Sequence, residues 1–353
     1  MSAKDSELTG VKEIARRANV SRGTVDRVIH NRTGVSQKTI DIVNAIIKEL
    51  DYQPNIFARS LASKKQVVFA VLIPGVSLET NYWEEPLLGI TEAGAEISPY
   101  GITLKKYLYD LNDKKSFLEQ IALIDLSTVQ GVLLAPSFIE ESEHFVKKLE
   151  SRKIPYVFIN SDIQGHDSLS YFGPDLYKSG YLSAHLMKYL VKEGEEILIV
   201  NISKEIDNQH HLLRKEEGFR NYFSDKKLTN PILKIDIKQT DYAYVSKSIE
   251  DVLQRHHVAA VFVTNSRVST VAKYLKRSGA ANRLLIGFDY TKENLAYLKS
   301  GDIDFLICQK PREQGYKGLM ALYQFVVHAK VGEKNNFMPI DIITSENCDF
   351  YIN

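Results

Sequence analysis

The 353-residue sequence lacks the short motifs with which several large enzyme classes bind substrates and metals. It has no Gly-x-Gly-x-x-Gly fingerprint, no phosphate-binding P-loop and no His-Glu-x-x-His zinc motif. No spacing suggests a Ser-His-Asp triad, and a glycosidase would need two carboxylates across a cleft. The neighbours His210-His211 and His256-His257 would diverge by about 100° on a helix, which is typical of solvated residues and not of a metal site. We therefore expect neither an enzyme nor a bound cofactor or metal.

Cysteine and long apolar runs are also scarce. The two cysteines, Cys308 and Cys348, stand in apolar or strand-like contexts and are typical of buried free thiols in a reducing compartment. The longest apolar run, Val67 to Pro74, is far shorter than the roughly 20 residues that span a bilayer. The first ten residues, MSAKDSELTG, have no apolar signal core. We expect a cytoplasmic protein that does not associate with membranes.

Charge is nearly balanced over the chain but unevenly distributed along it. The 45 Lys and Arg residues and 44 Asp and Glu residues give a net charge of +1. Residues 1–65 contain 12 basic and 7 acidic residues, a net charge of +5, whereas residues 66–353 contain 33 and 37, a net charge of −4. A small basic unit on a mildly acidic body suggests a head that binds nucleic acid.

Apolar periodicity in the basic unit predicts three short helices. Residues 10–18 repeat apolar side chains at helical spacing, Ser21 is a good N-cap for a second helix, and Ser36 is one for a third, which continues to Leu50. Two short helices with a brief turn, braced by a third, form a helix-turn-helix unit, although any small helical bundle has this periodicity. The second helix favours DNA binding because its outward face carries residues that contact phosphates and base edges: Arg22, Thr24, Arg27 and His30, with Ser21 at its start.

From residue 67 onward, strand patterns alternate with amphipathic helical ones. The predicted strands are 67–73, 102–109, 131–136, 156–160, 196–202, 233–238, 260–265, 284–289 and 305–309. Repeated βα units form parallel sheets that are covered by helices on both faces. Nine strands in this length predict two doubly wound units, which bind ligands at the carboxyl ends of their strands.

Polar side chains follow several of these strands. They are Asn160 and Ser161, Asn265 and Ser266, Asp289, and Gln309, while the loop after the first strand offers Asn81, Tyr82 and Trp83. Amides and a carboxylate can bracket hydroxyl groups, and aromatic rings can stack on the apolar face of a sugar. Each residue alone is more typical of a cap, a turn or a core position. Together, at one end of the strands, they predict a site for a polyhydroxylated ligand.

The N-terminal sequence resembles the head of the lactose/galactose repressor family. The pattern V-x-x-[IV]-A-x-x-A-x-V-S-x-x-T-V-x-R-V-[IL]-x-[NG] is met from Val11 to Asn31, and L-[DN]-Y-x-P-N-x-x-A-x-x-L is met from Leu50 to Leu61. The resemblance implies a helix-turn-helix domain over residues 1–53 and a hinge helix with its linker over 54–65. It also implies these DNA contacts: Ser21, Arg22, Gly23, Thr24, Asp26, Arg27, His30, Asn31, Asn55, Ala58 and Leu61.

The hinge also follows from local physics. Pro54 stops the third helix, and Asn55 can cap a new one of about two turns, which is marginal in water unless something holds it. In the resembled family the hinge helix pairs with its copy from a second subunit, and a leucine wedges into the minor groove. The matching residue is Leu61, and such a wedge kinks the duplex. A plain flexible linker is the alternative.

Residues 66–353 resemble the ribose-type periplasmic sugar-binding domain that this family uses as its sensor. The matching phrases are IPYVFINSD, AVFVTNS, LLIGFDYT and FLICQKPREQGYKG. The resemblance implies a ligand-binding role for Asn265, Asp289 and Gln309, with the aromatic pair Tyr82 and Trp83. The sequence departs from the family where Asn160-Ser161 replaces Asp-Arg, and the family's arginine before Gly218-Phe219 matches Arg214 only in uncertain register, with Lys215 beside it.

The sequence thus predicts an all-α helix-turn-helix head and an α/β body of two doubly wound subdomains, like type I periplasmic binding proteins. The predicted function is that of a homodimeric or larger transcriptional regulator, a repressor, that binds a near-palindromic operator and responds to a small ligand such as a sugar. Another polar metabolite remains open as the ligand. A cytoplasmic sugar-binding protein without DNA function is the main alternative, and a sugar-modifying enzyme is a third.

Asp26 is an unusual residue on a helix that approaches phosphates. It lies four residues after Arg22, on the same helical face. It can orient the Arg22 guanidinium toward a guanine, accept a hydrogen bond from a cytosine amino group, or form a surface pair without a DNA role. Gly23 removes a side chain where relatives often carry one, which would let the helix sit closer to the duplex.

Overall fold

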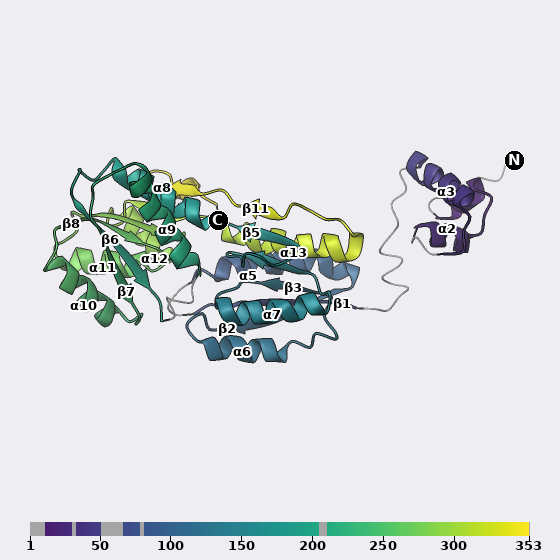
Figure 1. The fold of residues 1–353 in the computed structure, drawn as a ribbon, viewed down its shortest axis with the longest axis horizontal. Helices are drawn as coiled ribbons and strands as arrows, with labels where there is room; N and C mark the ends of the chain where they lie inside the picture. The colour runs from purple at the N-terminus through teal and green to yellow at the C-terminus, as the bar shows by residue number, and fades with distance from the viewer. Residues whose placement is uncertain (1–10, 30–32, 51–65, 78–80, 205–209, 353) are drawn as a thin grey trace. The chain divides into compact units, whose positions relative to one another are not determined.

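The computed structural model describes residues 11–29, 33–50, 66–77, 81–204 and 210–352 (Figure 1). The chain splits into two compact units, Met1–Lys65 and Gln66–Asn353. We call them the head and the body, and each is described by itself.

The described part of the head contains three helices around a small apolar core. They are α1 (Val11–Arg17), α2 (Arg22–Ile29) and α3 (Gln37–Glu49). The predicted caps are present, since the Ser21 and Ser36 hydroxyls accept hydrogen bonds from the amides of Thr24 and Thr39 at 3.1 and 3.3 Å. The apolar faces expected from the periodicity meet in one cluster, whose buried members are Ile14, Ala15, Val25, Val28 and Val43. The predicted helical head is therefore confirmed.

The body consists of two lobes, each built on one sheet. Lobe 1 begins with β1 (Val67–Pro74), α5 (Glu84–Ile97), η1 (Ser98–Tyr100), β2 (Ile102–Tyr109), α6 (Lys114–Leu123), β3 (Gly131–Leu134), α7 (Ile139–Ser151), β4 (Tyr156–Ile159) and β5 (Ser170–Gly173). It is completed by α13 (Pro311–His328) and β11 (Asn335–Phe337) from near the C-terminus. Its strand order is β11-β5-β4-β3-β1-β2, and every neighbouring pair is parallel.

Lobe 2 repeats this plan. Its elements are α8 (Leu176–Lys188), β6 (Glu196–Ile202), α9 (His210–Asp225), β7 (Ile232–Ile237), α10 (Tyr242–Leu253), β8 (Val258–Val263), α11 (Val268–Arg277), β9 (Leu284–Phe288), α12 (Lys292–Lys299), β10 (Phe305–Cys308), β12 (Asp341–Ile343) and η3 (Cys348–Phe350). The order β12-β10-β9-β8-β6-β7 matches that of lobe 1, except that β12 is antiparallel to β10. The two doubly wound units predicted from the sequence are confirmed.

Each sheet is buried between two layers of helices because alternate residues of its strands point to opposite faces. In lobe 1, α5 and α13 cover one face and α6 and α7 the other; in lobe 2, α8 and α9 cover one face and α10, α11 and α12 the other (Figure 1). Side chains of β1 divide accordingly, with Val71 in one core cluster and Leu72 in the other. Four of the described body helices, α6, α8, α10 and α12, begin at a side-chain cap; at α8, for example, the Asp175 carboxylate accepts from the amide of Lys178 at 2.9 Å.

The chain crosses between the lobes after β5, after β10 and after β11. As a result, α8 packs on α9 and α13 packs on α5. Glycines allow the helices of both pairs, α8 with α9 and α13 with α5, to pack closely. A Cβ at Gly180 of α8 would lie 1.9 Å from the Lys215 carbonyl oxygen of α9, and one at Gly315 of α13 would lie 2.3 Å from the Pro86 carbonyl oxygen of α5. Each of these closely packed helix pairs therefore lies next to a segment that joins the lobes.

The sequence patterns missed three strands, namely β5, β11 and β12. The β5 sequence, SYFG, is only four residues long and begins and ends with Ser170 and Gly173, both poor strand formers. Strands β11 and β12 have three residues each at the sheet edges, and neither has an alternating apolar pattern. The other strands agree with the predicted ranges to within a few residues.

Candidate functional site

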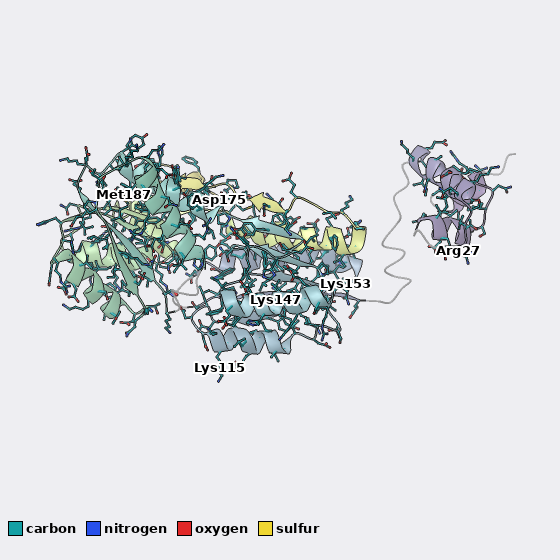
Figure 2. The ribbon with its side chains drawn as sticks, in the orientation of Figure 1. Arg27, Lys115, Lys147, Lys153, Asp175 and Met187 are labelled. Carbon is teal, nitrogen blue, oxygen red and sulfur yellow. The ribbon has the colours of Figure 1, made fainter. Side chains whose placement is uncertain are left out.

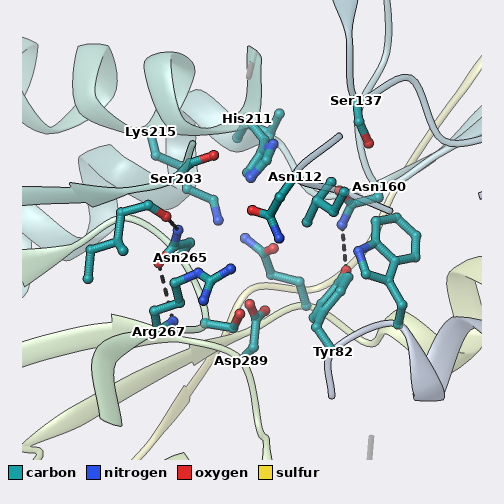
Figure 3. Close-up of a pocket in the computed structure, with 16 residues that line it drawn as sticks. Tyr82, Asn112, Ser137, Asn160, Ser203, His211, Lys215, Asn265, Arg267 and Asp289 are labelled. Carbon is teal, nitrogen blue, oxygen red and sulfur yellow. Dashed lines mark hydrogen bonds between the residues drawn. The ribbon is translucent and has the colours of Figure 1, made fainter. Parts of the chain in front are cut away.

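A cavity lies between the lobes at the carboxyl ends of their strands. Lobe 1 contributes residues from the loops after β1, β2, β3 and β4, and lobe 2 contributes residues from α9 and from the loops after β6, β8 and β9 (Figure 3). The crossovers after β5 and β10 supply Leu176 and Gln309. The described residues that line it are Tyr82, Trp83, Leu111, Asn112, Ser137, Asn160, Leu176, Ile202, Ser203, His211, Lys215, Asn265, Ser266, Arg267, Asp289 and Gln309.

The wall from lobe 1 is aromatic and uncharged in the part that the structure describes. Tyr82 and Trp83 pack edge to face, with ring centroids 5.2 Å apart, and they belong both to the lobe 1 core and to the cavity lining. The Asn160 side-chain amide donates a hydrogen bond to the Tyr82 hydroxyl at 2.5 Å. Burial raises the pKa of Tyr82 well above its ordinary value, so this hydroxyl stays neutral. The wall therefore offers aromatic side chains next to an amide that keeps further hydrogen-bonding capacity.

The wall from lobe 2 carries the ionisable groups. Asp289 and Lys215 are both buried, with exposed fractions of 9% and 4%. Burial raises the pKa of Asp289 to about 6, and the positive charge of Lys215 partly opposes this shift. Burial also lowers the pKa of Lys215 to about 8, and Asp289 partly opposes that shift. Between these two values both groups are charged, so the wall presents a carboxylate and an ammonium to the cavity at neutral pH.

A second layer of hydrogen bonds holds the loops of lobe 2. The buried Asn294 amide donates to the carbonyl oxygens of Ser266, Phe288 and Asp289 at 2.9 to 3.0 Å, which ties the loops after β8 and β9 together. The Asn265 side chain donates to the Ile202 carbonyl at 2.8 Å. Because these amides fix the backbone, the lining residues of this wall are oriented before any ligand arrives.

Asn160 and Asp289 hold equivalent positions in the two lobes. Each directly follows the fourth strand of its lobe, β4 or β9. Each has a left-handed backbone, with φ of 69° and 73°. Asn and Asp are the non-glycine residues that tolerate this conformation best, so the turn explains part of the residue choice at both positions. The strand-end rule therefore identifies two matched positions that face one cavity.

Gln309 links the two crossovers in addition to lining the cavity. Its side-chain amide donates to the Ser179 hydroxyl at 2.9 Å, and its carbonyl oxygen accepts from the Gln314 amide at 2.7 Å. Ser179 in turn donates to the Asp175 carbonyl at 2.8 Å, in the other crossover. Gln309 thus connects the cavity lining to both crossover segments.

Arg214 does not line this cavity. Its guanidinium pairs with Glu217 and lies 5.4 Å from the centroid of the Tyr177 ring, beside a different hollow near Asp175. The next residue, Lys215, faces the cavity instead. Successive residues of a helix diverge by about 100°. An alignment that is shifted by one residue therefore assigns the cavity-facing position to a side chain on another side of the helix. His211, one turn earlier on α9, lines the cavity too and is not the simply solvated residue that we expected.

Several lining residues were not singled out from the sequence. Apart from those of α9 and the first crossover, they lie near strand ends: Leu111 and Asn112 after β2, Ser137 after β3, Ser203 after β6 and Arg267 after β8. The rule that identified Asn160 and Asp289 would have found them if it had been applied to every strand. Of the predicted ligand residues, Tyr82, Trp83, Asn160, Asn265, Asp289 and Gln309 all line the cavity.

The head presents a polar face on α2. Val25 and Val28 are buried, whereas Ser21, Arg22, Gly23, Asp26 and Arg27 are exposed and Thr24 is half-buried. Figure 2 shows Arg27 extending from the outer side of the head. A Cβ at Gly23 would touch nothing closer than the Ser21 hydroxyl at 3.7 Å, so the fold of the head does not require glycine there. The remaining predicted contacts, His30, Asn31, Asn55, Ala58 and Leu61, lie outside the described residues.

The arginines of α1 differ from those of α2. Arg16 and Arg17 both pair with Glu13, and Arg17 also pairs with Glu49 of α3 at 2.8 Å. Hydrogen bonds from both arginines lower the pKa of Glu13 to about 2. Neither Arg22 nor Arg27 forms an ion pair with another residue in the part of the head that the structure describes. The side chains of Arg22 and Arg27 are thus exposed, and no acidic residue in the described part of the head pairs with either guanidinium group.

Two family models match the chain. Residues 69–330 match the periplasmic binding protein domain, and residues 10–55 match the bacterial regulatory proteins of the lacI family. The domain model covers most of the body, and the regulatory model covers the head. The chain therefore contains a periplasmic binding protein domain, which makes up most of its body, and a head that matches the bacterial regulatory proteins of the lacI family.

Individual relatives agree with this assignment. The transcriptional regulator RegA of Clostridium acetobutylicum is 28% identical over 185 residues, which are 52% of this chain and 52% of RegA. Catabolite control protein A of Priestia megaterium is 27% identical over 80% of this chain and 82% of that protein. The match to RegA thus spans about half the length of that protein.

A solved structure has the same fold as the body. A chain from Bacteroides fragilis, assigned as a LacI transcriptional regulator, superposes with a TM-score of 0.76 at 29% identity, covering 82% of this chain and all of its own. Among the helices that the structure describes, none is long and apolar enough to cross a membrane.

Proposed function

We propose that this protein is a transcriptional repressor whose affinity for operator DNA is set by a small sugar-like effector. The observation that carries the proposal is the combination of two sites in one chain. One is the exposed polar face of α2 in a separate compact head, and the other is the polar cavity between the lobes. The match of the head to the lacI family of regulatory proteins supports it.

In this proposal residues 1–53 of the head form the DNA-binding domain, and α2 enters a major groove. Arg22 and Arg27 contact phosphates or guanine edges, and Thr24 and Ser21 add hydrogen bonds. Residues 54–65 form a hinge helix that pairs with its copy in a second subunit, so the protein acts as a homodimer or a larger assembly on a near-palindromic operator. Asp26 either orients Arg22 or accepts from a cytosine, and Asp26→Ser would then change base preference at one position of each half-site.

The body, residues 66–353, is the sensor in this proposal. A ligand that favours one closure of the lobes changes the spacing of the two hinges and therefore the affinity for DNA. Such a coupling between sites is typically about 1–3 kcal/mol. Gln309 is suited to transmit it, because it lines the cavity and is hydrogen-bonded to Ser179 at the other crossover.

The chemistry of the cavity favours a sugar over other metabolites. Amides from Asn160, Asn265 and Gln309 and the carboxylate of Asp289 can bracket several hydroxyl groups, and Trp83 beside Tyr82 offers an aromatic face. No catalytic role is proposed, because the lining formed by the described residues has one carboxylate, that of Asp289, whereas sugar hydrolysis uses two. A regulator of this kind acts on chromosomal DNA, so the proposed location is the cytoplasm.

The test uses the glycine of α2 in the full-length chain. Purified protein selects sequences from a random duplex library, and we expect an inverted repeat to be enriched. Gly23→Ala should leave the fold intact, since the added methyl group meets only the Ser21 hydroxyl, yet weaken operator binding at least tenfold by separating helix and duplex.

The matched control is Asn44→Ala, at an exposed position of α3. We expect it to bind the selected sequence as the unaltered protein does. The proposal fails if no sequence is enriched, which would favour a sugar-binding protein without DNA function. It is also weakened if Gly23→Ala and Asn44→Ala bind equally well.

A further inference from the structure

Lys310 lies in the crossover after β10, where the chain returns to lobe 1. It stands between the cavity residue Gln309 and Pro311, the first residue of α13. Its backbone is left-handed, with φ of 52° and ψ of 55°. A lysine has a Cβ and no short polar side chain that could stabilise this conformation locally, so its surroundings must hold it there. The position of Lys310 therefore requires contacts that fix the crossover.

The ammonium group of Lys310 makes three such contacts with segments that follow α13 in the chain. It lies 4.0 Å from the centroid of the Tyr351 ring, donates a hydrogen bond to the Ile352 carbonyl oxygen at 2.5 Å and pairs with the Asp341 carboxylate at 3.5 Å. A cation is attracted to the face of an aromatic ring, and more strongly where water is partly excluded. The Lys310 side chain is 20% exposed, so it is largely shielded from water.

All three partners of Lys310 are anchored in lobe 2. Asp341 begins β12, which pairs with β10 in the lobe 2 sheet. Tyr351 and Ile352 come directly after η3, whose first residue, Cys348, is buried in a lobe 2 core cluster. Tyr290, in the loop after β9, donates its hydroxyl to the Cys348 carbonyl oxygen at 2.7 Å, and its ring lies 5.0 Å from that of Tyr351. The segment that holds Lys310 is therefore part of lobe 2.

Lys310 itself starts a helix of lobe 1. It is the N-cap residue of α13, which packs on α5 over the lobe 1 sheet. Its contacts therefore join a lobe 1 helix to lobe 2, next to the crossovers after β10 and β11. A rotation of the lobes about the crossovers would change the angle between α13 and lobe 2 and would stretch or break these contacts. Because the contacts are made while the lobes enclose the cavity, they favour that arrangement.

We propose that Lys310 is a positioning residue of the cavity, which clamps the start of α13 to lobe 2 and thereby favours closed lobes. The clamp also orients Gln309, which precedes Lys310 and lines the cavity. The effector of the proposed function would act on the same equilibrium between open and closed lobes. The clamp itself requires neither effector nor DNA, so its test is separate from the test of that function.

The single tryptophan of the chain reports on opening of the cavity. Trp83 lines the cavity on the lobe 1 side and is 3% exposed. In the full-length protein, quenching of its fluorescence by acrylamide measures how often the cavity opens to solvent. We expect Lys310→Met to raise the quenching constant about twofold or more, because open lobes become more populated when the clamp is lost.

Two further variants separate the clamp from a general loss of structure. Tyr351→Leu removes the ring beneath the ammonium group and should raise the quenching constant as Lys310→Met does. Lys310→Arg keeps a cation for the ring and a donor for the Ile352 carbonyl oxygen, so it should retain the low quenching of the unaltered protein. The left-handed backbone is equally unfavourable for methionine and arginine, so their comparison isolates the positive charge. Circular dichroism and urea denaturation check that each variant is folded.

Lys299→Met is the matched control. Lys299 of α12 pairs with Asp349 of η3, but both side chains are exposed and both belong to lobe 2, so this pair does not join the lobes. We expect its quenching constant to equal that of the unaltered protein. The clamp is overturned if folded Lys310→Met and Tyr351→Leu are quenched no more than the unaltered protein. It is also overturned if Lys310→Arg or Lys299→Met is quenched as strongly as Lys310→Met.

Discussion

Lobe 1 and lobe 2 share one strand order, yet the residue that ends the fourth strand is an amide in one and a carboxylate in the other. Asn160 and Asp289 have nearly the same left-handed backbone, with φ of 69° and 73°, and both line the cavity. Around Asn160 the lining is uncharged and aromatic, whereas around Asp289 it holds Lys215 and Arg267. The common fold therefore fixes where side chains enter the cavity, and each lobe has its own chemistry there.

This division means that the proposed effector would meet two walls of different chemistry. Lobe 2 offers it charged and hydrogen-bonding groups, and lobe 1 offers aromatic rings, whose contact depends on shape and exclusion of water. Closure would be favoured only by a ligand that satisfies both walls, which is the differential affinity that a regulatory switch needs.

The two lobes can also be compared in how their helices pack. In lobe 2, α8 meets α9 at Gly180 and Gly218, and in lobe 1, α13 meets α5 at Gly315 and Gly89. A Cβ at any of these glycines would lie between 1.9 and 2.3 Å from a backbone carbonyl oxygen of the facing helix. The lobe 2 crossing includes the carbonyl oxygen of Lys215, which lines the cavity, whereas the lobe 1 crossing includes that of Arg312, which does not line it.

The largest expected effect comes from adding a methyl group at these crossings. Gly180→Ala and Gly315→Ala should each lower the free energy of unfolding by about 3 kcal/mol, because backbone on both sides must shift to admit the new atom. Only Gly180→Ala should also weaken binding of the proposed sugar effector, since it displaces the backbone of Lys215, which lines the cavity. Urea denaturation and calorimetry measure the two effects.

Gly332→Ala is the matched control, because a Cβ there would have no neighbour within 4 Å. It should change neither quantity. If Gly315→Ala weakens binding as much as Gly180→Ala does at equal stability, the two crossings are equivalent, and the link between packing and the cavity in lobe 2 is wrong.

Asp289→Asn makes the charged lobe resemble the neutral one. Asparagine tolerates the left-handed backbone at this position, so the fold should be kept. Hydrogen bonds to a charged group are worth about 1.5–3 kcal/mol, and the substitution should therefore weaken binding of the best sugar at least tenfold. Calorimetry checks this, and an unchanged affinity would remove Asp289 from the set of ligand contacts.

The pH dependence of stability should also separate the lobes. Burial raises the pKa of Asp289 from 3.8 to about 6, so the folded state favours the protonated carboxyl group. The stability that this preference contributes is full below pH 3.8 and is lost as the pH rises through about 6. Asp289→Asn should therefore gain about 2 kcal/mol relative to the unaltered protein between pH 4 and 6.5. Urea denaturation across this range measures the difference between the two proteins.

The matched residue in lobe 1 supplies the control. Asn160→Ala removes an uncharged side chain, so its effect on the free energy of unfolding should be independent of pH over the same range. Lys215 affects stability in the opposite direction and at higher pH. Burial lowers its pKa to about 8, and the stability that this shift contributes is lost as the pH falls through that value. A pH-independent difference for Asp289→Asn would mean that its carboxyl group is less buried than the structure indicates.

Much of this plan could be predicted from the sequence, because it depends on local patterns. Strand alternation and helix caps gave the two doubly wound units, and the strand-end rule brought Tyr82, Asn160 and Asp289 to one cavity. The resemblance to the lactose/galactose repressors agrees with both family models. These features involve neighbouring residues or the general geometry of parallel sheets.

The remaining features depend on contacts between distant segments. Whether Arg214 or Lys215 faces the cavity is decided by how α9 lies on α8, with Gly180 against the Lys215 carbonyl oxygen. Strands β11 and β12 form only because the chain returns to each sheet after α13, and their own sequences have little preference for strand. The concentration of charge in lobe 2 likewise appears only when the loops after β8 and β9 lie beside α9.

The smallest expected effect concerns the side chains that flank the two crossings. In lobe 1, Arg312 of α13 pairs with Glu92 of α5, and these side chains are 41% and 47% exposed. In lobe 2, the His185 ring of α8 is hydrogen-bonded at 2.9 Å to the hydroxyl of Tyr222 on α9, which is 2% exposed. Exposed ion pairs contribute little, so Glu92→Gln should leave the unfolding midpoint unchanged within error.

Tyr222→Phe should cost about 1 kcal/mol, the usual contribution of a hydrogen bond between uncharged groups. Urea denaturation at low and high potassium chloride checks both variants, since salt would remove any small effect of the Glu92 pair but not that of the buried tyrosine. A larger loss from Glu92→Gln than from Tyr222→Phe would reverse the comparison. It would mean that the exposed ion pair of lobe 1 stabilises its helix pair more than the buried hydrogen bond of lobe 2 stabilises the other pair.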